Sequence, residues 1–152
     1  MTEGSAEYWF YHLEASTLEG VLPGLLEKTL EKGWRALVKC PQARLAELDA
    51  FLWTYRDEAF LPHGRDDEPM TEIQPILLSA DIQLASSFEA VFLLDGAEIS
   101  DMTGVSRAMV MINGRSEADI KRERGRWKAL KETGANLAYY QQDERGRWEK
   151  KA

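Results

Sequence analysis

The strongest constraint on the fold is the alternation of short apolar runs with longer segments that carry apolar residues at helical spacing. The apolar runs read YWFYHL at 8–13, WRALVKC at 34–40, ILLS at 76–79, AVFLL at 90–94, RAMVMIN at 107–113 and LAYYQQ at 137–142. Continuous apolar runs of this length are typical of strands that are buried on both faces, as in a parallel sheet. Because helical segments separate several of them, the sequence predicts an α/β fold with a doubly wound, mostly parallel sheet.

The first helical segment covers residues 18–32, where leucine and valine recur at helical spacing. Thr17 is available as the N-cap, whereas Pro23 fits the first turns of a helix that begins later, near Leu22. The sequence therefore leaves the start of this helix open. Gly33 is expected to end it.

Two further helices are predicted. One opens at Pro41 and runs to about Tyr55, with leucine and alanine on its apolar face. The other is the stretch 116–137, with Ser116 as the N-cap and Gly134 in the position of a C-cap glycine.

Length and composition predict one domain over residues 1–152, because a chain of 152 residues that is 44% apolar can bury a sizeable core. We expect residues 1–7 to be a disordered leader and residues 141–152 to be a C-terminal tail. The first residues lack the order of a signal peptide, and no run of 18 apolar residues occurs. A cytoplasmic protein without membrane contact is therefore expected, and Cys40, in an apolar run, is expected to be a buried thiol.

Between the second helix and the strand at 76–79 lies a long, polar connection, residues 54–75, that carries prolines and an acidic cluster. Loops of this length inside a compact domain are usually functional or mobile.

Charge is distributed unevenly along the chain, whose formal net charge is −7. Residues 1–106 hold 7 basic and 19 acidic side chains, whereas residues 107–131 hold 8 basic ones. An acidic protein with one basic surface favours a specific acidic partner over long DNA, because the field of the other surfaces repels phosphates.

The predicted helix at 116–137 places four cations on one stripe: Lys121, Arg124, Lys128 and Lys131. Ile120, Trp127 and Leu130 are expected to form its core-facing edge, which puts Trp127 at the boundary between the apolar and basic faces. Two interpretations follow. The stripe is either a solvated charged face or a docking site for an acidic ligand that contains an aromatic group.

The residues give little support to catalysis or to a bound cofactor. No GxGxxG or GxxxxGK[ST] motif follows the first strand, so neither a nucleotide cofactor nor any other is predicted. His12, His63 and Cys40 lack the close spacings of a metal site, and no metal ion is expected. His12, near the end of an aromatic strand, is expected to be a packing residue.

Two other functions remain open. Asp95 and Glu98 follow a strand at the edge where α/β enzymes place their chemistry, which allows a metal-assisted phosphoester hydrolase. The alternative for Asp95 is a turn after the strand. In the third hypothesis the basic helix binds single-stranded DNA directly, with Trp127 stacking on a base.

Several segments resemble the chi subunit of bacterial DNA polymerase III, an accessory protein of the clamp-loader complex. They are FYHLE at 10–14, GWRALVKC at 33–40, LDAFLWTYRDEAFLPHG at 48–64, QPILLS at 74–79 and RWKALKETGANLAYYQQ at 126–142. The combination of LDxxLW with FxPH is the distinctive element, and the resemblance covers most of the chain.

The resemblance implies one α/β domain with a nucleotide-binding-like topology and no catalysis. It implies an adaptor between the polymerase machinery and single-stranded-DNA-binding protein, so that contact with DNA is only indirect. The ligand implied is the acidic C-terminal tail of single-stranded-DNA-binding protein, which ends in a phenylalanine carboxylate.

The resemblance also assigns two surfaces. Arg124, Trp127 and Lys128 match the family's arginine, aromatic and lysine positions for the acidic tail, and Lys121 and Lys131 extend the stripe. The second surface consists of Trp53 and Phe60. It resembles the surface that binds the psi subunit or an accessory helicase; alternatively, these two residues close the core over the loop.

Overall fold

The computed structural model describes residues 7–54, 63–65, 75–82, 88–99 and 101–151 of the chain. The strands in this part are β1 (Glu7–Leu13), β2 (Ala36–Lys39), β3 (His63–Arg65), β4 (Ile76–Ser79), β5 (Ala90–Leu93), β6 (Arg107–Asn113), β7 (Asn136–Gln142) and β8 (Trp148–Lys150). The helices are α1 (Leu18–Glu31), α2 (Gln42–Thr54) and α3 (Glu117–Glu132).

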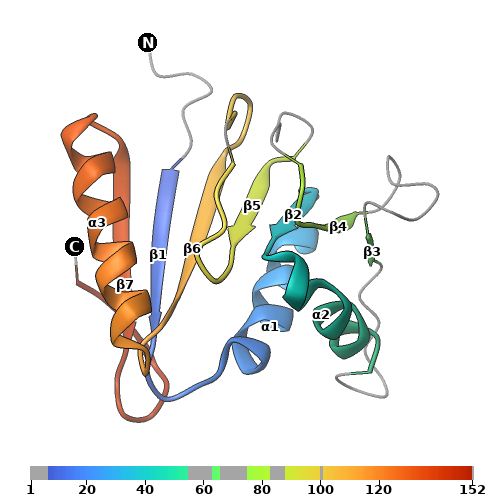
Figure 1. Ribbon diagram of the computed structural model, residues 1–152, viewed down its shortest axis with the longest axis horizontal. Helices are drawn as coiled ribbons and strands as arrows, with labels where there is room; N and C mark the ends of the chain where they lie inside the picture. The colour runs from blue at the N-terminus through green and yellow to red at the C-terminus, as the bar shows by residue number, and fades with distance from the viewer. Residues whose placement is uncertain (1–6, 55–62, 66–74, 83–87, 100, 152) are drawn as a thin grey trace.

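All of these strands form one sheet in the order β3-β4-β2-β5-β6-β1-β7-β8. Every neighbouring pair is parallel except β7 and β8, which pair antiparallel. The predicted α/β fold with a mostly parallel sheet is confirmed, and the arrangement is visible in Figure 1.

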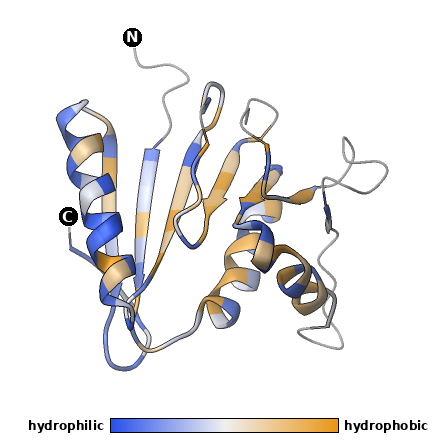
Figure 2. Cartoon of the chain, viewed as in Figure 1, coloured by the Kyte–Doolittle hydropathy of each residue, from blue (hydrophilic) through white to orange (hydrophobic). Residues whose placement is uncertain are grey.

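Side chains alternate between the two faces of the sheet, and each face has its own apolar core. In β1, Tyr11 and Leu13 belong to one core, whereas Phe10 belongs to the other. Helices α1 and α2 cover the first core and α3 covers the second, which makes the sheet doubly wound. In Figure 2 the buried strands β2 and β5 are hydrophobic over most of their length, while α3 is largely hydrophilic.

Helix α1 begins at Leu18, not near Leu22, and Pro23 lies inside it. The Thr17 Oγ1 atom accepts a hydrogen bond from the Gly20 amide at 3.1 Å, which caps the helix as predicted. Leu22 and Pro23 are both buried in the core under the sheet. This burial offsets the one helical hydrogen bond that proline cannot donate.

The predicted C-cap glycine of α3 is confirmed, and the helix itself ends within the stretch 116–137. It ends at Glu132, the chain turns at Gly134 with a φ of 81°, and β7 begins at Asn136. The Ser116 N-cap is confirmed, since its side chain accepts a hydrogen bond from the Asp119 amide.

The strand predicted at 137–142 is confirmed as β7, and the segment 141–152, expected to be a C-terminal tail, contains a further strand. Strand β7 continues to Gln142, and residues 148–150 form β8 beside it. Gly146, with a φ of 82°, lies in the turn between them. The short run of 148–150 carries one apolar residue, which is too weak a signal to predict an edge strand.

The structure also bears on the predicted leader at 1–7, the connection at 54–75 and the buried Cys40. Glu7 belongs to β1 and not to a leader, while residues 1–6 lie outside the described residues. Within the 54–75 connection the structure describes the edge strand β3. Cys40 is buried, as expected. In the described part of the chain, no helix has the length and apolar character needed to span a membrane.

The turn between β6 and α3 requires glycine, whereas a glycine inside α3 does not. A Cβ atom at Gly114 would lie 2.8 and 2.9 Å from His12 ring atoms and still closer to the Leu13 carbonyl. At Gly125 nothing lies within 4 Å. We expect Gly114→Ala to destabilise the protein by about 1–3 kcal/mol, and the control Gly125→Ala to stabilise it by about 0.5–1 kcal/mol. Chemical denaturation tests both; equal shifts would contradict the tight packing at Gly114.

Candidate functional site

Buried carboxylates hold α3 against the sheet. Asp119 is 7% exposed and Glu123 is 1% exposed, although both belong to a helix rich in charge. The Asp119 Oδ2 atom accepts a hydrogen bond from the Asn113 amide at 2.7 Å, which ties the first turn of α3 to the end of β6. The sequence pattern did not reveal this, because both residues read as ordinary surface carboxylates.

Arginines on the same side of α3 neutralise these carboxylates. Arg122 pairs with both Asp119 and Glu123, and the Arg126 Nε atom lies 2.9 Å from Glu123 Oε1. Arg126 also donates a hydrogen bond to the Ala97 carbonyl at 3.0 Å, which joins α3 to the loop after β5. Arg122 and Arg126 are therefore structural cations that fix the orientation of the helix.

The four stripe cations have a different environment. Lys121, Arg124, Lys128 and Lys131 are all exposed. Among the described residues, none of the ion pairs involves them. The structure thus separates the cations of α3 into a pair that is neutralised by buried carboxylates and a stripe of four exposed cations.

Trp127 lies between the stripe and the core, as predicted. It is partly buried and packs against the core together with Ile120 and Leu130. Its ring meets Phe10 edge-on at a centroid distance of 5.2 Å and Tyr139 at 5.5 Å. Such edge-to-face contacts hold the indole in place, so it is both a core residue and a wall of the adjoining pocket.

A pocket of about 480 Å³ brings Arg124 and Trp127 together. The residues around it are His12, Glu14, Gly114, Ile120, Arg124, Trp127, Tyr139, Gln141 and Lys151. Of the predicted binding residues, Lys121, Lys128 and Lys131 are outside its lining. The contributions of β1, β7 and Lys151 depend on strand order, which the sequence does not reveal.

His12 forms the polar floor of this pocket. Its Nδ1 atom is 2.7 Å from the Tyr139 hydroxyl, and its Nε2 atom is 3.5 Å from a Glu14 carboxylate oxygen. Burial lowers the pKa of His12; Glu14 acts in the opposite direction, and Arg124 lowers the pKa further. Burial likewise raises the pKa of Tyr139. At neutral pH the His12 ring is therefore uncharged, and the charged groups of the pocket are the cations Arg124 and Lys151 and the Glu14 carboxylate.

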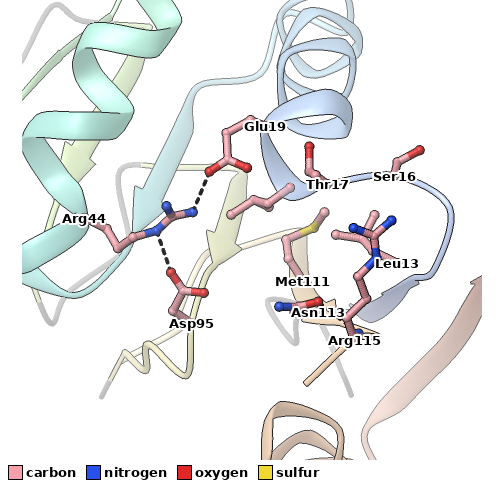
Figure 3. Close-up of a pocket in the computed structure, with 10 residues that line it drawn as sticks. Leu13, Ser16, Thr17, Glu19, Arg44, Asp95, Met111, Asn113 and Arg115 are labelled. Atoms are coloured by element: carbon pink, nitrogen blue, oxygen red, sulfur yellow. Dashed lines mark hydrogen bonds and ion pairs between the residues drawn. The ribbon is translucent and has the colours of Figure 1, made fainter. Parts of the chain in front are cut away.

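A second pocket, of about 420 Å³, lies at the carboxyl ends of β1 and β6 (Figure 3). The chain leaves these neighbouring strands toward opposite faces of the sheet, which is where doubly wound folds bind ligands. Here Arg44 spans the crevice. Its Nη2 atom lies 2.9 Å from Glu19 Oε1, and its Nε atom lies 2.8 Å from Asp95 Oδ2. Two carboxylates facing the crevice disfavour a phosphate group.

Comparison with known proteins identifies the family. Residues 6–138 match the family described as "DNA polymerase III chi subunit, HolC". The chain belongs to the DNA polymerase III chi subunit family. It is also 22% identical over 100 residues to a protein of Rickettsia prowazekii (strain Madrid E) named "Probable DNA polymerase III subunit chi". That match covers 65% of this chain and 61% of the relative's length.

Membership of the chi family gives no support to the hydrolase hypothesis, and the geometry gives none either. Asp95 and Glu98 line one shallow pocket of about 280 Å³, so the fold does bring them together. However, Arg44 binds the Asp95 carboxylate, and Asp95 has a φ of 51° in a turn with Gly96, as its alternative interpretation predicted. Within the described ranges, no group of three or more His, Cys, Asp or Glu residues converges as metal ligands.

The second surface predicted for this chi-family chain, Trp53 with Phe60, falls outside the described residues. Phe60 lies in the segment 55–62, and Trp53 belongs to α2 but its side chain is not described. The surface stays a prediction.

Glu123 is expected to stabilise the site's supporting helix. Glu123→Ala leaves the Arg126 side chain, 14% exposed, without its carboxylate partner. Removing one member of a buried ion pair costs about 3 kcal/mol, which urea denaturation will measure. Glu132→Ala, at the exposed end of α3, is the matched control and should change stability by less than about 0.5 kcal/mol. Equal losses in both variants would contradict the anchoring role of Glu123.

The lowered pKa of His12 predicts a pH dependence of stability. Below its ordinary pKa of 6.5, the unfolded chain binds this proton more readily than the folded one. The contribution of His12 is therefore fully present above that pH and is lost as the pH falls toward the folded-state pKa. The advantage of the wild type over His12→Gln in unfolding free energy should shrink between about pH 7.5 and about pH 5. A constant difference would contradict the shift.

Proposed function

We propose that this chi-family protein is a non-catalytic replication adaptor that binds the acidic, phenylalanine-ended C-terminal tail of single-stranded-DNA-binding protein. The observation that carries the proposal is that Arg124 and Trp127 line one pocket. Arg124 belongs to a stripe of exposed cations that makes none of the ion pairs among the described residues. In this proposal the tail links single-stranded-DNA-binding protein to the clamp-loader complex of DNA polymerase III. Contact with DNA is then made through the partner protein.

The chemistry of the pocket fits both groups of the ligand's terminal residue, its carboxylate and its aromatic side chain. An arginine guanidinium keeps its charge at every physiological pH and can donate two parallel hydrogen bonds to one carboxylate. Arg124 is therefore assigned to the terminal carboxylate of the peptide. Ile120, Trp127 and the Tyr139 ring offer apolar surface beside it, which we assign to the terminal aromatic side chain.

The other stripe cations guide the peptide toward this pocket. Lys121, Lys128 and Lys131 are exposed on α3, whereas the whole chain carries a net charge of −7. An acidic peptide is repelled by most of the surface and attracted to this stripe, which raises the association rate and sets the orientation. The ion pair of each of these lysines stabilises the complex by only about 0.2–1 kcal/mol, so the aromatic contact and the hydrogen-bonded Arg124–carboxylate pair decide the affinity.

The test is the affinity of a fluorescent peptide that is acidic and ends in phenylalanine. We expect Arg124→Ala to weaken binding at least about tenfold, because it removes a charged hydrogen-bonding partner of the terminal carboxylate. Lys28→Ala removes an exposed cation of α1, on the opposite face of the sheet, and should leave the affinity within about twofold. Fluorescence anisotropy at fixed ionic strength measures both variants.

Two results would contradict the proposal. The first is an equal effect of Arg124→Ala and Lys28→Ala on peptide binding. The second is tight binding of a single-stranded oligonucleotide by the protein alone, with steep salt dependence and no response to the peptide. That outcome would favour direct DNA binding by the stripe.

A further inference from the structure

The hairpin of β7 and β8 carries Lys151 to the pocket that contains Arg124. Lys151 lines this pocket together with His12, Tyr139 and Trp127, although it lies outside residues 6–138 that match the family. Arg124 comes from α3, whereas Lys151 follows the edge strand of the sheet. The two cations thus reach one pocket from different elements.

Hydrogen bonds in the turn fix the path of this hairpin. The Asp143 carboxylate accepts bonds from the Arg145 and Arg147 amides at 2.8 and 2.9 Å, and from Arg147 Nε at 3.0 Å. These bonds lower the pKa of Asp143, that from the Arg147 amide most strongly. Beyond the strand, the Lys151 amide donates to the Tyr139 carbonyl at 2.7 Å. The backbone at Lys151 is therefore still attached to the sheet.

Trp148 determines which side chains of β8 face the pocket. Its ring packs edge-on against Tyr11 at 5.1 Å, in the core under α1 and α2. Successive residues of a strand point to opposite faces, so Lys150 lies on the same side as Trp148. Glu149 and Lys151 lie on the other side, which α3 covers. Placing Trp148 in its core thus directs Lys151 toward the pocket.

Glu149 forms an ion pair with Lys151. The Lys151 Nζ atom is 2.9 Å from Glu149 Oε2, and both side chains are 51% exposed. An exposed pair of this kind is weak and exchanges readily with other carboxylates. A carboxylate of a bound peptide can therefore replace Glu149 at the lysine.

We propose that Lys151 is the second cation of the peptide pocket and that Glu149 competes with the ligand for it. The inference rests on the proposed function and specifies its ligand: a peptide with an acidic side chain close to the carboxylate of its terminal aromatic residue. Arg124 binds the terminal carboxylate, and Lys151 binds the acidic side chain across the pocket. The β7–β8 hairpin is then one wall of the site.

The test uses anisotropy with two peptides that end in phenylalanine, one with acidic residues before it and one with those residues replaced by their amides. We expect Lys151→Ala to weaken binding of the acidic peptide about three- to fivefold. Glu149→Gln should strengthen binding of the acidic peptide by about twofold, because the carboxylate that competes for Lys151 is removed. With the amide peptide both effects should disappear.

Lys150→Ala is the matched control, because it removes the same charge from the neighbouring residue on the opposite face. Its effect on the acidic peptide should be less than half that of Lys151→Ala. Equal effects of the two lysine variants, or weaker binding by Glu149→Gln, would overturn the inference while leaving the Arg124 site intact. Failure of the wild type to bind either peptide would instead overturn the proposed function and the inference with it.

Discussion

The structure depends on the pairing of β1, which lies between β6 and β7 and is parallel to both. All seven residues of β1 are in register with β6, and six are in register with β7. A parallel neighbour requires a crossover that returns the chain to the same end of the sheet, and helices supply these crossovers. Helices α1 and α3 pack on opposite faces, so both faces of β1 are buried under a helix. Residues of β1 line both the pocket beside α3 and the crevice at the ends of β1 and β6.

The charged residues of α3 form two groups: buried carboxylates with their arginine partners, and cations that face solvent. Asp119 and Glu123 are buried and require cations, which Arg122 and Arg126 provide. A buried carboxylate without a partner would be costly, so these arginines are committed to the fold. The remaining cations face solvent and stay available to a ligand. One helix thus serves both as an anchored element of the fold and as a basic surface.

The two pockets differ in their chemistry more than in their size. The crevice at the ends of β1 and β6 lies where related folds bind nucleotides, yet the ion pairs of Arg44 with Glu19 and Asp95 span it. The pocket beside α3 has an uncharged histidine floor, an aromatic wall and a basic rim. An acidic peptide with a terminal aromatic group matches the second and not the first. In the proposed function, the doubly wound architecture is kept while the peptide binds beside α3 and not in this crevice.

The sequence by itself determined the fold class, most strand positions, the caps of α1 and α3, and the stripe that contains Arg124, with Trp127 beside it. These features follow from local periodicity and capping chemistry, which are written in neighbouring residues. Only the tertiary structure decided the strand order, the burial of Glu123, the strand β8 and the meeting of His12, Tyr139 and Lys151 in one pocket. Those depend on contacts between residues distant in the chain: β1 and β7 are far apart in sequence, and their side chains become neighbours through parallel pairing. Local pattern cannot encode which strands are adjacent, because that choice is made by the packing of the whole sheet.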